Sequence, residues 1–171
     1  NQGLVPCNRT ETLAALLNQG PIVPAFQTPI YSNSAFTLLG YVLEEMSGLS
    51  YSSAIRDLIT KPLALMRTSV DTPNDRNIIT PLGLSSEFSQ QLGDLAAAGS
   101  MYSTLNDLSN FGRAILNSTL LSVDLTRRWM KPHAFTSDPI SSVGAPWEIF
   151  RFDVQLEAES DSTRPIYLFT K

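Results

Sequence analysis

Apolar residues recur every three or four positions along most of the chain, a spacing that predicts amphipathic helices. The strongest stripe lies in residues 34–47, whose opposite face carries Glu44 and Glu45. The apolar members of this stripe are Leu38, Leu39, Val42, Leu43 and Met46. Weaker stripes predict four more helices, over residues 10–19, 52–60, 104–116 and 122–129.

Small polar residues mark the expected starts of these helices, because their side chains can accept a hydrogen bond from a free backbone N–H group. The predicted N-caps are Thr10, either Asn33 or Ser34, Thr104 and Ser122. Asp107, three residues after Thr104, gives that start the pattern of a capping box with an acidic third residue.

The sequence changes in character towards its end. Residues 147–152 (WEIFRF) and 166–170 (IYLFT) are rich in aromatic and β-branched residues, so they predict two strands. An acidic connector over residues 153–161 separates them, and a hairpin is the simplest arrangement. We therefore divide the chain into a mostly helical domain, residues 1–135, and residues 136–171, which contribute strands.

Composition limits the classes of protein to which the chain can belong. It has 171 residues, of which 43% are hydrophobic, and a formal net charge of -4, as expected for a globular domain. The lysines and arginines form no cluster that could neutralise phosphates, which argues against nucleic acid as a partner. No apolar run approaches the roughly 20 residues that span a bilayer.

Two Asn-x-Ser/Thr sequons suggest a secreted glycoprotein, with Asn8 and Asn117 as the acceptors. Such triplets also arise by chance. Cys7 is the only cysteine, and in a secreted protein it would be expected to form a disulfide with a cysteine outside this chain. A small buried apolar residue is the alternative interpretation of Cys7.

The stretch PIYSNSAF places Tyr31 and Asn33 at the start of the strongest helix. One interpretation is structural: Asn33 or Ser34 caps the helix while Tyr31 packs under the proline-rich loop before it. The other is catalytic, with a phenol and an amide aimed at a substrate. A Tyr-x-Asn pair is too short to decide, and on these residues alone the structural interpretation is favoured.

Longer stretches around this pair resemble the serine β-lactamase and penicillin-binding-protein superfamily, in particular its class C β-lactamase and esterase-like branch. The similarity begins with Tyr-Ser-Asn and a Leu-Gly helix, and continues through Ser-Gly-Leu-Ser-Tyr over 47–51 and Pro-Leu-Ala-Leu-Met-Arg-Thr over 62–68. Residues 97–108 resemble the branch's Ala-Gly-Gly-Leu-x-Ser-Thr-x-x-Asp-Leu stretch, with Ser100 in place of the second Gly. The end of the chain, GAPWE and FTK, is similar to secreted fungal members.

The resemblance implies a mixed α and β fold of the β-lactamase/transpeptidase type. The chain would supply most of the helical domain and edge strands of the antiparallel sheet of the α/β domain. The family's serine nucleophile lies in a Ser-x-x-Lys motif, and no Ser-x-x-Lys occurs in this sequence. Lys171 matches the lysine that opens the family's Lys-Thr-Gly-like motif. We therefore expect an internal fragment of a longer secreted hydrolase.

The resemblance also implies the roles of individual residues in acyl transfer through a serine. Tyr31 would act as the general base on the serine, Asn33 would bind the substrate's amide or ester, and Lys171 would flank the tyrosine. No cofactor is implied, and no His, Cys or Asp cluster has metal-ligand spacing. The substrate would be a small ester or amide. Family members act on β-lactams, simple esters or D-amino-acid peptides, or transfer acyl groups, and the sequence does not separate these activities.

The electrostatics of such a site are feasible. A free tyrosine titrates near 10, so acting as a base near pH 7 requires about 4 kcal/mol of stabilisation of the phenolate. One ammonium about 4 Å away supplies roughly that at an effective dielectric constant of about 20. A non-catalytic binding protein or pseudo-enzyme of the same fold is the alternative, and a Ser-x-x-Lys in the parent sequence would discriminate between the two.

Overall fold

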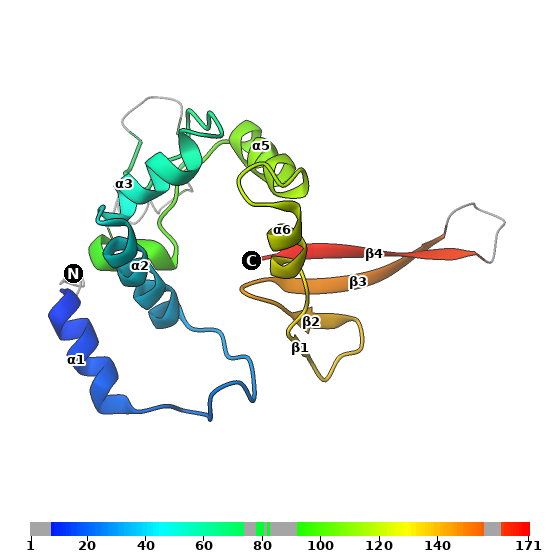
Figure 1. Ribbon diagram of the computed structural model, residues 1–171, viewed down its shortest axis with the longest axis horizontal. Helices are drawn as coiled ribbons and strands as arrows, with labels where there is room; N and C mark the ends of the chain where they lie inside the picture. Colours follow the sequence, from blue (N-terminus) through cyan, green and yellow to red (C-terminus); the bar gives the residue numbers. More distant parts are fainter. Residues whose placement is uncertain (1–7, 74–77, 81, 83–91, 156–161) are drawn as a thin grey trace. The chain divides into compact units, whose positions relative to one another are not determined.

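The computed structural model describes residues 8–73, 78–80, 82, 92–155 and 162–171 (Figure 1). Contacts group the chain into two compact units. The first comprises Asn1–Ile22 and Tyr31–Ala114, and the second Val23–Ile30 and Ile115–Lys171. The predicted domain boundary after residue 135 remains a prediction. No helix in the described ranges is long and apolar enough to cross a membrane.

The first unit is helical, as the periodicity predicts. Its elements are α1 (Arg9–Gln19), α2 (Asn33–Ser47), α3 (Tyr51–Ile55), a π-helical turn η1 (Arg56–Thr60), a 3-10 helix η2 (Gly93–Ala98) and α5 (Leu105–Leu116), whose last residues belong to the second unit. The predicted helix over 52–60 is therefore α3 continued by η1. The 3-10 helix was not expected, because residues 93–98 contain no apolar stripe of helical period.

Two predicted N-caps are wrong. Asn8, not Thr10, caps α1, and it forms a reciprocal capping box with Glu11. Ser32, not Asn33 or Ser34, caps α2: its backbone is extended and its side chain accepts a hydrogen bond from the backbone N–H of Ala35 at 3.2 Å. Only the residue that still has extended backbone can aim its side chain back at the first helical turn, and Thr10 and Asn33 already lie inside their helices.

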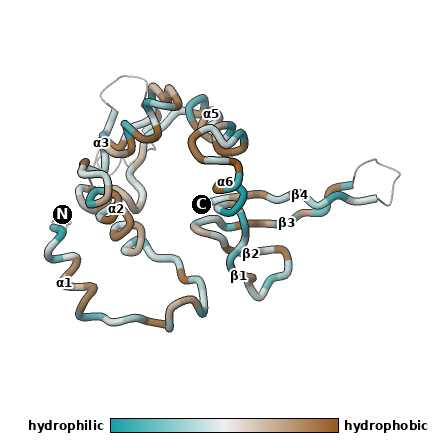
Figure 2. The backbone as a smooth tube through the Cα atoms, in the orientation of Figure 1, coloured by the Kyte–Doolittle hydropathy of each residue, from teal (hydrophilic) through white to brown (hydrophobic). Residues whose placement is uncertain are grey.

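The core of the first unit is built around α2, along which hydrophobic positions recur (Figure 2). Thr37 and Ala54 are fully buried. Gly40 faces η2 so closely that a Cβ added to it would lie 2.6 Å from the Cβ of Ala97. Absence of a side chain at Gly40 therefore sets the distance between α2 and η2.

We expect Gly40→Ala to destabilise the full-length protein by about 1–3 kcal/mol, because the added methyl group overpacks the contact with Ala97. Urea unfolding measures this change. Gly112→Ala is the matched control in α5, since a Cβ at Gly112 meets nothing within 4 Å. There the higher helix propensity of alanine should stabilise by about 0.5–1 kcal/mol. Equal effects at the two glycines would contradict the close-packing account.

Besides the end of α5, the described part of the second unit contains a short helix and an antiparallel sheet. The helix is α6 (Val123–Trp129), capped by Ser122 as predicted. The strands are β1 (Ala134–Phe135), β2 (Ser141–Val143), β3 (Glu148–Gln155) and β4 (Thr163–Thr170), hydrogen-bonded in that order. The two predicted strands are confirmed, and both are longer than expected. The rest of the predicted acidic connector, residues 156–161, lies outside the described residues.

β3 and β4 form the main hairpin, with eight paired positions from Glu148 and Thr170 to Gln155 and Thr163. At the end of the hairpin near Lys171, the ring of Trp147 packs against Trp129 with centroids 4.9 Å apart. It also meets Phe169 edge-on at 5.9 Å. These aromatic contacts hold α6 against the sheet of the second unit.

Candidate active site

The Tyr-Ser-Asn stretch forms a compact polar arrangement at the start of α2. The Tyr31 hydroxyl donates a hydrogen bond to Oδ1 of Asn33 at 2.9 Å. Ser32, between them, caps the helix. The cap fixes the chain direction at Ser32, so that Tyr31 and Asn33 lie on either side of it and their side chains meet.

The Asn33 end of this pair is anchored from within the helix. Thr37, which is fully buried, donates a hydrogen bond from its hydroxyl to the backbone carbonyl of Asn33 at 3.2 Å. An asparagine amide has two N–H donors besides its acceptor oxygen. The oxygen of Asn33 binds Tyr31, so its amide nitrogen is the part that can donate to a carbonyl of a bound ester or amide.

Tyr31 itself is 65% exposed, so its ring contributes little to the core. Lys171 follows the last residue of β4, in the second unit. Tyr31 and Asn33 belong to the first unit. The predicted convergence of Lys171 with the Tyr-Ser-Asn stretch stays a prediction.

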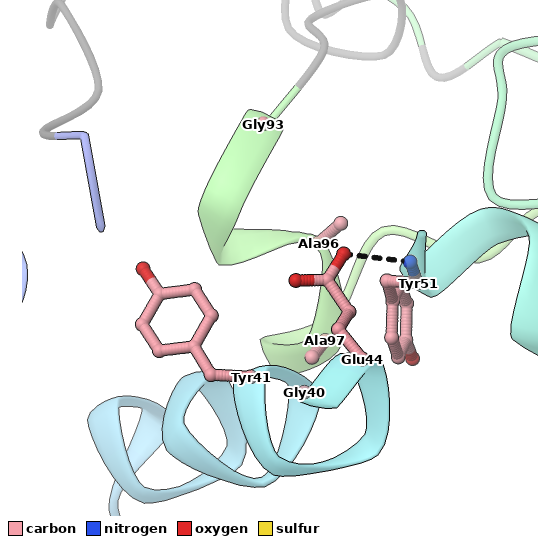
Figure 3. Close-up of a pocket in the computed structure, with 7 residues that line it drawn as sticks. All are labelled: Gly40, Tyr41, Glu44, Tyr51, Gly93, Ala96 and Ala97. Atoms are coloured by element: carbon pink, nitrogen blue, oxygen red, sulfur yellow. Dashed lines mark hydrogen bonds between the residues drawn. The ribbon is translucent and has the colours of Figure 1, made fainter. Parts of the chain in front are cut away.

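A second polar group in the first unit is structural rather than catalytic. Glu44 accepts a hydrogen bond from the backbone N–H of Tyr51 at 2.7 Å and pairs with Arg9 at 3.2 Å, so both carboxylate oxygens are engaged. A small cavity of about 40 Å³ lies beside Glu44 and Tyr51 (Figure 3). Burial raises the pKa of Tyr51, which keeps its hydroxyl neutral near pH 7 and unsuited to act as a base.

For Asp107, the sequence predicted only a part in the capping box at the start of its helix. Its backbone N–H does donate to the hydroxyl of Thr104, as expected for the cap. Its carboxylate, however, is buried and accepts hydrogen bonds from the backbone N–H of Arg67 at 2.7 Å and the hydroxyl of Thr68 at 2.9 Å. Asp107 thus ties the start of α5 to the segment around Arg67. Its place in the Asp-Leu stretch of the resemblance was the available signal.

The remaining predicted sites have simpler outcomes. Asn8 and Asn117 are both exposed. Cys7 lies outside the described residues, so its disulfide remains a prediction. In the described parts of the chain, no three His, Cys, Asp or Glu residues are grouped closely enough to hold a metal ion.

The fold and the Tyr-Ser-Asn arrangement can be compared with known proteins. The family model described as Beta-lactamase matches residues 3–156, so the chain belongs to the beta-lactamase family. The "Beta-lactamase-like protein" of Arthroderma benhamiae is 32% identical over 146 residues, covering 85% of this chain and 24% of that protein. The "Probable hydrolase clz13" of Cochliobolus lunatus is 29% identical over 159 residues, covering 93% and 25%.

Among solved structures, the D-amino acid amidase from Ochrobactrum anthropi superposes with a TM-score of 0.67 at 24% sequence identity, covering 86% of this chain and 47% of the amidase. Together with the family match, this similarity shows the predicted mixed α and β fold of the β-lactamase/transpeptidase type, with helices and an antiparallel sheet. The chain spans about a quarter of the length of the two fungal relatives.

Proposed function

We propose that this chain is part of a secreted serine hydrolase or acyltransferase that acts on small esters or amides through an acyl-enzyme. The observation that carries the proposal is the hydrogen bond of Tyr31 to Asn33 on an exposed side chain, in a member of the beta-lactamase family. The relatives described as a probable hydrolase and a D-amino acid amidase support a substrate with an ester or amide bond.

In the proposed reaction, Tyr31 starts as a phenolate and takes the proton of a serine hydroxyl. The serine oxygen forms a bond to the substrate's carbonyl carbon. Collapse of this intermediate breaks the bond to the alcohol or amine, which leaves with the proton from Tyr31. Water, deprotonated in the same way, then releases the acid from the acyl-enzyme, or an acceptor alcohol or amine takes the acyl group.

The proposed roles of Lys171 and Asn33 follow from the charge of the lysine and the hydrogen-bond donors of the asparagine. In the structure the Tyr31 hydroxyl donates to Oδ1 of Asn33. In the proposed reaction the ammonium of Lys171 stabilises the phenolate. The amide nitrogen of Asn33 then serves as the donor to the substrate's carbonyl side.

The nucleophile in this proposal is the serine of a Ser-x-x-Lys motif elsewhere in the parent protein, because these residues contain no such motif. Secretion is proposed on the exposed sequon asparagines Asn8 and Asn117. Loss of apparent mass on treatment of the natural protein with a glycosidase that removes N-linked glycans would support it. A disulfide of Cys7 with a cysteine elsewhere in the protein belongs to the same proposal.

Labelling of the full-length protein with a serine-directed acylating probe tests the proposed function. We expect stoichiometric labelling of one serine, and peptide mapping should place it in a Ser-x-x-Lys outside these 171 residues. Hydrolysis of a nitrophenyl ester should be lost in step with labelling. A protein that neither labels nor hydrolyses would be the pseudo-enzyme of the alternative hypothesis, and a label within residues 1–171 would overturn the assignment of the nucleophile.

A further inference from the structure

The second unit contains an open apolar pocket that the proposed chemistry does not yet use. It has a volume of about 400 Å³, in the range of ligand sites in proteins. Its walls come from the segment after α6, the β1–β2 hairpin, and one face of β3 and β4. The apolar side chains that define it include Phe135, Ile140, Ile149, Tyr167 and Phe169.

The part of this pocket that β3 and β4 supply lies near the end of β4 that precedes Lys171. Ile149 pairs directly with Phe169, and Arg151 with Tyr167, so these four side chains share one face of the hairpin. Trp147, just before β3, packs its ring edge-on against Phe169 with centroids 5.9 Å apart. Lys171 follows the end of β4 and is two residues beyond Phe169, a distance of about 7 Å in extended backbone. Phe169, which lines the pocket, thus lies close along the chain to the candidate catalytic lysine.

The charged residues around the pocket limit the kinds of chemical group that it can bind. Its lining residues include no carboxylate, and Lys131 and Arg151 are the cations among them. Arg151 is paired with Asp153 at 2.7 Å, which leaves Lys131 as the stronger attraction for an anion. An apolar group that is neutral or anionic therefore suits the pocket, and a cationic one does not.

We propose that this pocket binds the acyl group of the substrate, and that the preferred substrates carry an aromatic or branched aliphatic acyl group. This inference rests on the proposed function, because it assigns the pocket to the bond cleaved next to Lys171. Desolvation of such a group against Phe135, Ile140 and Phe169 favours the larger ester over an acetyl ester, which cannot reach these side chains.

The test compares nitrophenyl phenylacetate with nitrophenyl acetate on the full-length protein. Wild-type kcat/KM should be about ten-fold or more higher for the phenylacetate ester. Phe135→Ala removes one wall from a side chain that is 83% exposed, so folding should be little affected. This variant should lose most of the preference while keeping its activity on acetate.

Two further variants sharpen the comparison. Ile140→Trp, at a residue that is 46% exposed, fills the pocket, so it should lower kcat/KM for the phenylacetate ester and leave kcat/KM for the acetate ester unchanged. Phe152→Ala is the matched control, because Phe152 is partly exposed and alternation places it on the opposite face of β3. It should leave the ratio of the two esters unchanged.

The outcomes separate the two proposals. Turnover of neither ester overturns the proposed function, and the acyl-pocket assignment with it. Turnover of acetate without a preference for phenylacetate, or with equal effects of each variant on both esters, overturns the acyl-pocket assignment alone. Selective loss on phenylacetate in both Phe135→Ala and Ile140→Trp, but not in Phe152→Ala, supports the assignment.

Discussion

Replacement of Tyr31 by Phe in the full-length protein is expected to lower kcat on nitrophenyl acetate by about 10²-fold or more, the usual scale for loss of a general base. The change removes one hydroxyl and leaves the ring in place. The serine then has no positioned acceptor for its proton, whereas binding of the ester is affected little. Steady-state kinetics should therefore show the loss in kcat rather than in KM.

Folding should be nearly unaffected by Tyr31→Phe. The lost hydrogen bond to Asn33 lies at an exposed site, where water replaces it, so the free energy of unfolding should change by less than about 1 kcal/mol. Tyr51→Phe is the matched control: it removes the hydroxyl of a half-buried tyrosine in the same unit, and activity should persist. A Tyr31→Phe protein that is fully active but poorly folded would restore the structural interpretation of the Tyr-Ser-Asn stretch.

The helices of this chain could be predicted because their signals are local. The stripe in residues 34–47 needs only its own sequence to be recognised, and α2 spans Asn33–Ser47. The N-caps were harder to predict, because two residues that can cap a helix lie within two positions of each other at the start of both α1 and α2. Asn8 and Thr10 have similar capping side chains, and the backbone angles that decide between them depend on where the preceding chain arrives.

The short strands could not be predicted for a different reason. β1 and β2 have two and three residues, too few to show a period of two. β2 is a strand because β3 supplies its hydrogen-bonding partner, with Ser142 opposite Ile149, and β1 pairs in turn with β2. The 3-10 helix η2 is similar: it is held by close packing of Ala97 on Gly40, a contact between segments almost sixty residues apart.

The residues of the candidate site also differ in whether a local sequence pattern predicts their roles. The contact between Tyr31 and Asn33 spans two positions, and their spacing alone raised the question of a joint role. The role of Lys171 came only from the resemblance, because no local pattern links residues 140 positions apart. Asp107 shows the limit most clearly: a capping pattern explains its backbone N–H, whereas its carboxylate serves a segment forty residues earlier.

Replacement of Asp107 by Ala is expected to destabilise the full-length protein by about 3 kcal/mol. Asp107 is 4% exposed, and its carboxylate receives both the N–H of Arg67 and the hydroxyl of Thr68 on the same oxygen. Removing it takes this acceptor from both donors in a place that water reaches poorly, although the Thr68 hydroxyl keeps its 2.8 Å contact with the hydroxyl of Ser103. Urea unfolding gives the free energy, and hydrogen exchange of the Arg67 amide reports the local opening directly.

Asp107→Asn should cost much less, about 1 kcal/mol, because its amide oxygen can take the position of the one carboxylate oxygen that accepts both bonds. Asp124→Ala is the matched control, since Asp124 is an exposed aspartate in the first turn of α6, and only its interaction with the helix dipole is lost. Faster exchange at Arg67 in Asp107→Ala alone is the expected pattern. If Asp107→Ala and Asp124→Ala were equally mild, Asp107 would be a helix cap only, and the segment around Arg67 would be held by other contacts such as the backbone bridge between Ser69 and Tyr102.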